Sequence, residues 1–127
     1  MNHTSTATSL NKIAGLYRVL GHYEQSEDLY LKALEVWKKT LGNYHPYVAK
    51  CLNNLGFLHQ AQNEFNESEH FYKQAIEVLE KSGSKESVDM ITTLMNLAEL
   101  YEKMGRPEEA ARRRQYAEEI VSRRMSA

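Results

Sequence analysis

The sequence is poor in the residues and segments that mark secreted or membrane-bound proteins. Its 127 residues include a single cysteine, Cys51, so no disulfide can form within the chain. No apolar run approaches the ~20 residues that a membrane-spanning helix requires. Residues 1–6 lack the basic start and apolar core of a secretion signal. We therefore expect a reducing, cytoplasmic setting and no membrane partner.

The chain also lacks an excess of charge of either sign. Sixteen lysines and arginines stand against 17 aspartates and glutamates, which gives a formal net charge of -1 at pH 7. Proteins that bind nucleic acids through the phosphate backbone usually carry a strongly basic face. The arginines between Arg106 and Arg124 are interleaved with glutamates and are largely offset by them. We expect no nucleic-acid partner.

Motifs that carry catalysis or bind cofactors are absent as well. The sequence has no Gly-rich phosphate loop, no Cys-x-x-Cys pair and no nucleophile-elbow serine. Glu67 and His70 have the Glu-x-x-His spacing of di-iron proteins, but such centres need that motif twice and it occurs once. Cys51 precedes the expected core residue Leu52, which favours a buried structural thiol. The sequence therefore predicts no enzyme, no cofactor and no metal.

What the sequence does contain is a repeat of 42 residues. Similar residues recur at this spacing in three successive places: Leu10, Leu52 and Leu94; Ile13, Leu55 and Leu97; Leu16, Leu58 and Leu100; Ala33, Ala75 and Ala117. Periods of 20 to 50 residues indicate stacked supersecondary units. Three such periods account for nearly the whole chain. We therefore predict a single domain over residues 1–127, with repeats at about 1–42, 43–84 and 85–127.

Each repeat is predicted to consist of two helices. The second repeat starts a helix near Pro46, where a missing N–H is tolerated, and continues it with one apolar stripe: Val48, Leu52, Leu55 and His59. Residues that tolerate a left-handed backbone follow at equivalent positions in the three repeats: Gly21, Asn63 and Gly105. Small residues in mid-helix, such as Gly56, predict close helix packing. The predicted fold is all-α, a stack of three antiparallel helix-turn-helix repeats.

These motifs resemble the tetratricopeptide repeat, and in particular its 42-residue kinesin-light-chain type. In the second repeat the resemblance is carried by Leu41-Gly42, His45-Pro46, Val48-Ala49 and Leu52-Asn53-Asn54-Leu55. In the first it is carried by Gly21-x-Tyr23 and Leu29-Tyr30-x-x-Ala33-Leu34. The resemblance covers nearly the whole chain. It implies that the three repeats form a right-handed α-solenoid, and it implies protein or peptide binding without catalysis or a cofactor.

The sequence departs from the family pattern at two informative places. His59 stands where the family has a tyrosine, and Arg114 stands where the earlier repeats have Tyr30 and Tyr72. A solenoid needs a polar end. Arg114 therefore predicts that the last helix serves as its own polar cap, whereas the N-terminal repeat shows no such cap. Self-association through that repeat, which would give a homo-oligomer, is the alternative to peptide binding.

The resemblance implies that the first helix of each repeat lines a concave groove. The residues that lie off the apolar stripe there are the predicted peptide-binding residues: Asn11, Lys12, Arg18, Lys50, Asn53, Asn54, Phe57, Gln60, Met95, Asn96 and Glu99. Asparagine amides both donate and accept, which suits them to an extended peptide backbone. The aromatic Phe57 is expected at the centre. Lysines and arginine favour an acidic ligand at one end and Glu99 a basic one at the other. The alternative is that these residues are simply the solvated face of surface helices.

Overall fold

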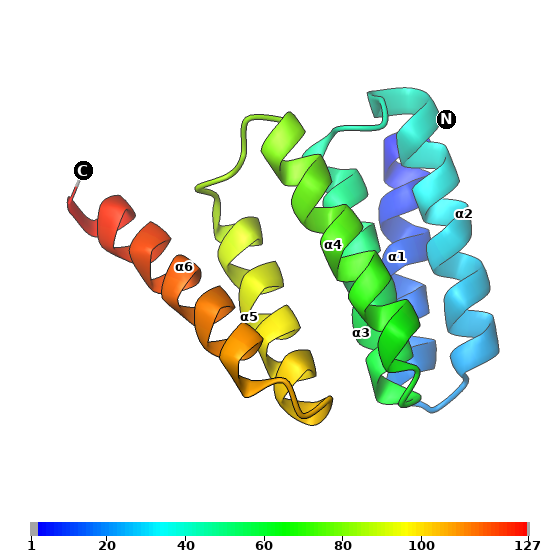
Figure 1. Ribbon diagram of the computed structural model, residues 1–127. Helices are drawn as coiled ribbons and strands as arrows, with labels where there is room; N and C mark the ends of the chain where they lie inside the picture. The colour runs from blue at the N-terminus through cyan, green and yellow to red at the C-terminus, as the bar shows by residue number, and fades with distance from the viewer. Residues whose placement is uncertain (1–2, 127) are drawn as a thin grey trace.

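The computed structural model describes residues 3–126, and its described part is built of six α-helices without strands (Figure 1). The helices are α1 (His3–Val19), α2 (Tyr23–Leu41), α3 (Pro46–Ala61), α4 (Phe65–Lys81), α5 (Val88–Lys103) and α6 (Pro107–Ser126). They form three antiparallel pairs, α1 with α2, α3 with α4 and α5 with α6, stacked along the chain. The predicted all-α stack of helix-turn-helix repeats is confirmed.

The turn inside each pair has the same backbone structure in all three repeats. Its closing residue has a positive φ each time: 82° at Gly21, 60° at Asn63 and 73° at Gly105. The next residue donates its N–H to the carbonyl oxygen five positions back, for example from Glu64 to His59 at 2.9 Å. This bond satisfies a carbonyl at the helix end. The turn positions inferred from the 42-residue spacing are therefore the observed ones.

The helices that follow the longer connections begin with different caps. At α3, the Nδ1 atom of His45 accepts a hydrogen bond of 3.1 Å from the N–H of Tyr47, and Pro46 is the first helical residue. At α5, the hydroxyl of Ser87 accepts one of 3.2 Å from the N–H of Met90. Both caps satisfy an N–H that the helix itself leaves without a partner. The third repeat therefore starts its helix without the His-Pro pair of the second.

The first helices of the pairs lie on one side of the stack and the second helices on the other. Helix α3 contacts both α1 and α5, whereas among the described residues α2, α4 and α6 do not contact one another. Neighbouring pairs are joined by α2 packing on α3 and by α4 packing on α5. The inner surface is thus formed by α1, α3 and α5, which carry the predicted binding residues.

Gly56 shows how closely the two helices of a pair approach. A Cβ atom at this position would lie 2.7 Å from ring atoms of Tyr72 on α4. The backbone oxygen of Gly56 also accepts a hydrogen bond of 2.6 Å from the hydroxyl of Ser68. The close approach inferred from the small residue is therefore explained, and the group that requires it is an aromatic ring.

The two ends of the stack differ from its interior. Ile13 and Leu16 on α1 are 43% and 64% exposed, whereas their equivalents Leu55 and Leu58 on α3 are fully buried. At the other end Arg114 forms an ion pair of 2.7 Å with Glu102. An open apolar cavity of about 590 Å³ nevertheless lies between α5 and α6, lined by Ile91, Met95, Ala117, Glu118, Val121, Ser122, Met125 and Ser126. The third repeat therefore combines a polar contact at Arg114 with an apolar hollow, and the polar cap remains a prediction.

Candidate binding groove

Asparagines of neighbouring repeats are joined to one another along the inner surface. The Nδ2 atom of Asn54 donates to Oδ1 of Asn11 at 3.1 Å, and Nδ2 of Asn96 donates to Oδ1 of Asn53 at 3.2 Å. We call these two contacts the asparagine ladder. Each contact uses one N–H and one carbonyl oxygen, which leaves three N–H groups and one carbonyl of the pair for other partners. The ladder fixes the side chains and keeps most of their hydrogen-bonding groups.

A cavity of about 210 Å³ opens beside the ladder. Its lining residues come from all three repeats: Asn11, Ala49, Lys50, Asn53, Asn54, Asp89, Thr92 and Thr93. Four of the predicted groove residues are therefore brought together at one place. The ammonium of Lys50 and the carboxylate of Asp89 line the same cavity, so its charge is mixed.

Phe57 lies farther along the same face of α3 and remains 38% exposed. The guanidinium carbon of Arg18 is 4.7 Å from the centre of its ring, within the range of a cation–π contact. Arg18 was expected at one end of the groove as a contact for acidic ligands. The structure places it against the central aromatic residue instead, so the two side chains form one combined apolar and cationic surface.

Gln60 is wrongly predicted as a groove residue. Its side chain is 5% exposed, and its Oε1 atom accepts a hydrogen bond of 3.0 Å from the hydroxyl of Tyr72. The contact connects the two helices of the second pair. The equivalent positions of the third repeat, Glu102 and Arg114, form an ion pair in the same place. This contact could have been found in the sequence, because both members of the pair change together between repeats. Gln60 and Tyr72 of the second repeat are replaced by Glu102 and Arg114 in the third, and each pair is 12 residues apart.

The remaining predicted residues are distributed along the inner surface. Lys12 is exposed near the N-terminal end, and Glu99 is exposed with an ion pair of 3.7 Å to Lys103. Asn96 belongs to the asparagine ladder. Met95 is 43% exposed and lines the apolar cavity between α5 and α6 rather than the polar one. The predicted apolar contact at Met95 thus belongs to a separate hollow.

Polar side chains also connect neighbouring repeats at the edge of the stack. At the first junction, where α2 packs on α3, the Nε2 atom of His59 lies 2.9 Å from Oε2 of Glu27, and its Nδ1 atom lies 2.8 Å from Oε1 of Glu64. At the second junction, where α4 packs on α5, the hydroxyl of Tyr101 donates to Glu69 at 2.8 Å. Tyr101 and Glu69 are each 42 residues beyond His59 and Glu27, so the two contacts are equivalent.

The second junction contains a strong ion pair in addition. Arg106 binds Glu69 at 3.0 Å and Glu109 at 2.7 Å. Burial alone would raise the pKa of Glu69, but hydrogen bonds from Arg106, Tyr101 and Lys73 outweigh it and lower that pKa to about 2. Glu69 is therefore ionised at any physiological pH. None of these residues was identified as a contact from the sequence.

The only cysteine is buried and unreactive. The thiol of Cys51 is fully buried and donates a hydrogen bond of 3.1 Å to the backbone oxygen of Tyr30. Burial raises the pKa of this thiol to about 12, so the nucleophilic thiolate is not formed near neutral pH. The predicted structural thiol agrees with this geometry.

Among the described residues, no helix is long and apolar enough to cross a membrane.

Comparisons with known proteins agree with this architecture. A family model described as Tetratricopeptide repeat matches residues 5–81, and a second model with the same description matches residues 93–115. No curated protein matches the sequence.

Solved structures share the fold at low sequence identity. BtubC (BKLC) from P. vanneervenii superimposes with a TM-score of 0.87 at 24% identity, over 95% of this chain and 48% of that chain. A putative kinesin light chain from Podosopora anserina, with nearly identical TPR-like repeats, gives 0.80 at 19% identity, over 100% and 61%. The TPR domain of Arabidopsis FLU gives 0.77 at 15% identity, over 99% and 100%. The chain thus spans about half of the first and three-fifths of the second. It belongs to the tetratricopeptide repeat family.

Proposed function

We propose that the chain is a non-enzymatic scaffold that binds an extended peptide, or an extended segment of a partner protein, in the groove of α1, α3 and α5. Repeats of this family typically act as protein-interaction modules. The observation that carries the proposal is the asparagine ladder beside a polar cavity. The ladder presents fixed donors and an acceptor that an extended backbone can pair with in either direction.

The side chains around the ladder supply affinity and some selectivity. Phe57, with Arg18 on its ring, offers an apolar surface beside a positive charge. A ligand side chain that is aromatic, or apolar next to a carboxylate, suits this combination. Lys50 and Asp89 at the cavity can each bind an opposite charge. A groove whose side chains are held in place before binding loses less entropy when the ligand docks.

The proposal is tested by selecting peptides from a random display library against the wild-type chain. Enriched peptides are labelled and titrated by fluorescence anisotropy. We expect the double variant Asn53→Ala/Asn54→Ala to weaken binding about tenfold or more, since each lost factor of ten corresponds to ~1.4 kcal/mol. Phe57→Ala should have an effect of similar size because it removes the apolar contact.

A matched control uses the opposite side of the molecule. Lys32 on α2 is exposed, so Lys32→Ala removes a surface side chain without touching the groove. Its affinity for the selected peptides should equal that of the wild type. The groove is not the binding site if the two groove variants retain full affinity, or if Lys32→Ala loses as much as they do.

A second candidate function is end-to-end self-association through the N-terminal repeat. The exposure of Ile13 and Leu16 favours it, because the equivalent residues of the second repeat, whose first helix packs against the preceding helix pair, are fully buried. A second copy that covered this face would bury the same kind of surface. Light scattering across a concentration series tests the idea. A homo-oligomer should form and should dissociate in Leu16→Asp, whereas a monomer at all concentrations would exclude it.

We further propose a cytoplasmic setting and a protein rather than a nucleic-acid partner. The near-neutral charge and the buried thiol of Cys51 support this assignment. Fluorescence anisotropy with labelled RNA and DNA duplexes at low salt tests the second part, and salt-sensitive binding would contradict it.

A further inference from the structure

His59 occupies an unusual place at the end of α3. It is 8% exposed, and its ring is stacked on Phe71 with a centroid distance of 5.3 Å and an interplanar angle of 17°. Both ring nitrogens face carboxylate oxygens, Nε2 that of Glu27 and Nδ1 that of Glu64. The ring is therefore held in one orientation from three sides.

The two nitrogens cannot both donate in a neutral ring. If Nε2 carries the proton and donates to Glu27, the Nδ1 lone pair points at the carboxylate of Glu64, 2.8 Å away. Two acceptors at that distance repel each other unless a positive group lies between them. A histidine whose Nε2–H is held by a carboxylate is also the arrangement that orients a metal-binding imidazole.

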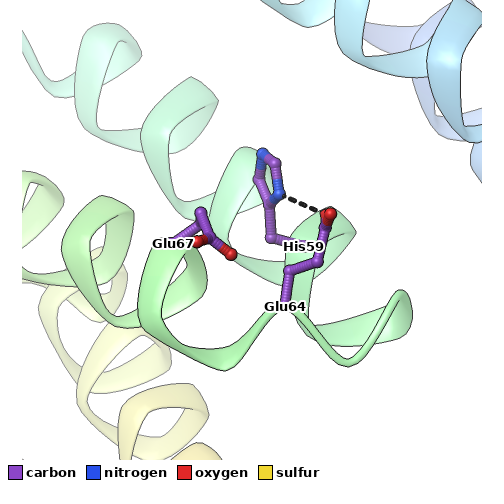
Figure 2. Close-up of side chains that lie close together, drawn as sticks. All are labelled: His59, Glu64 and Glu67. Atoms are coloured by element: carbon purple, nitrogen blue, oxygen red, sulfur yellow. Dashed lines mark hydrogen bonds and ion pairs between the residues drawn. The ribbon is translucent and has the colours of Figure 1, made fainter.

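A second carboxylate faces the same point. Glu67, from the first turn of α4, lies with His59 and Glu64 so that one ligand atom from each falls within 4.8 Å of the others. Figure 2 shows the three side chains gathered where the turn enters α4. Within the described part of the chain, no lysine or arginine forms an ion pair with Glu27, Glu64 or Glu67.

The third repeat shows which side chain lies at the position equivalent to Glu64. The residue equivalent to Glu64 is Arg106, and its guanidinium binds both Glu69 and Glu109. Those two glutamates are the equivalents of Glu27 and Glu67. A cation supplied by the chain itself thus occupies this position in the third repeat. In the second repeat Glu64 stands in place of this arginine. Among the described residues, no lysine or arginine therefore takes the position of the guanidinium there.

We propose that His59, Glu64 and Glu67 form a binding site for a divalent transition-metal cation of the Zn²⁺ class. The ligands are Nδ1 of His59 and one oxygen from each carboxylate, with Glu27 holding the Nε2–H from the preceding repeat. One imidazole and two carboxylates suit Zn²⁺, whose nitrogen and oxygen ligands lie at about 2.0–2.2 Å, and they leave a position for water. The nitrogen ligand disfavours Mg²⁺ and Ca²⁺, which prefer oxygen.

Metal binding would act on the first junction of the stack. The ligands connect the end of α3 to the start of α4, and Glu27 extends the connection to α2. Since a ligand that binds only the folded chain raises its stability by mass action, Zn²⁺ should raise the thermal midpoint. The inference does not depend on peptide binding in the groove.

The test is isothermal titration calorimetry of the full chain with ZnCl₂ in a buffer that does not chelate. We expect one site per chain, unaffected by an excess of Mg²⁺ or Ca²⁺. His59→Tyr and Glu67→Gln should each weaken binding at least tenfold. His59→Tyr introduces the residue that the first and third repeats carry, and Tyr101 shows that its hydroxyl reaches the equivalent glutamate. Glu67 is exposed, so Glu67→Gln leaves the packing unchanged.

The control variant is His70→Gln, which removes an exposed histidine three residues from Glu67 and should bind Zn²⁺ like the wild type. Nitrogen NMR of the histidine rings gives a direct reading, since Zn²⁺ should shift the Nδ1 signal of His59. The proposal is overturned if no site is detected, if binding survives both ligand variants as adventitious binding would, or if His70→Gln loses it equally.

Discussion

The two junctions between helix pairs place equivalent side chains at equivalent positions and fill them with different charges. At the second, Glu69 receives hydrogen bonds from Tyr101 and Arg106, and the arginine also binds Glu109. At the first, the imidazole of His59 lies between the carboxylates of Glu27 and Glu64. The repeat geometry is therefore independent of the polar chemistry that joins one repeat to the next.

The difference bears on which junction an added cation could stabilise near neutral pH. At the second, Arg106 pairs with Glu69, and the pKa of Glu69 is so low that its charge does not change near neutral pH. At the first, the carboxylates of Glu27 and Glu64 face the imidazole of His59, and among the described residues no lysine or arginine pairs with them. The proposed metal site would therefore let an added cation stabilise the first junction but not the second.

The largest expected effect breaks the second junction. Glu69→Ala removes the acceptor of the buried Tyr101 hydroxyl and one of the two carboxylates that Arg106 binds, so it should lower the free energy of unfolding by about 1–3 kcal/mol. Glu27→Ala at the first junction should lower it by about 1 kcal/mol, because that glutamate has one partner and is more exposed. Urea denaturation measures both. Equal losses would mean that the two junctions are equally strong.

The loss of stability in acid, below about pH 5, should come from the second junction. The folded pKa of Glu69, about 2, lies below that of a glutamate in an unfolded chain, so the unfolded state takes up more protons as the pH falls. The stabilisation is therefore fully present above about pH 5 and is lost toward pH 2. The difference in stability between the wild type and Glu69→Gln should shrink by about 1–3 kcal/mol over this window. A constant difference across parallel denaturant titrations would contradict the assignment.

The smallest effect converts the first junction into a copy of the second. Glu64→Arg puts a guanidinium where Arg106 lies in the third repeat, within reach of the equivalents of Glu69 and Glu109. The new ion pairs are partly exposed, so a gain of about 0.5–1 kcal/mol is expected in urea denaturation. Any stabilisation by Zn²⁺ should disappear in the same variant. A loss of stability would show that the junctions are less alike than their backbones.

Much of the fold could be predicted because the information is local and recurs. The left-handed residues Gly21, Asn63 and Gly105 and the helix start at Pro46 depend only on neighbouring residues. The small residue at Gly56 indicated a close approach but not the ring of Tyr72 that causes it. Local conformation and period were thus readable, whereas the identity of the packing partner was not.

The candidate site was predicted less completely because its contacts cross the repeats. The single helix face around Asn53, Asn54 and Lys50 was identified by its period, but the pairing of asparagines across 43 residues was not. Gln60 was misplaced because its partner, Tyr72, lies on another helix. The contact of His59 with Glu27 spans 32 residues, and the equivalent contact in the next repeat uses a tyrosine, Tyr101, in place of the histidine. No sequence motif therefore identifies it. Side-chain partners of this kind follow only from the packed structure.

The number of contacts in the asparagine ladder sets the length of the inner surface that a ligand could follow. Every added repeat of 42 residues that keeps its asparagines would extend the ladder by one contact and lengthen the groove by one helix width of 8–10 Å. A ligand bound mainly through its backbone, as we propose, would then be selected by the number of ladder contacts it spans more than by its sequence. Adding or removing repeats would therefore change the length of ligand that fits, while the chemistry of each asparagine contact stays the same.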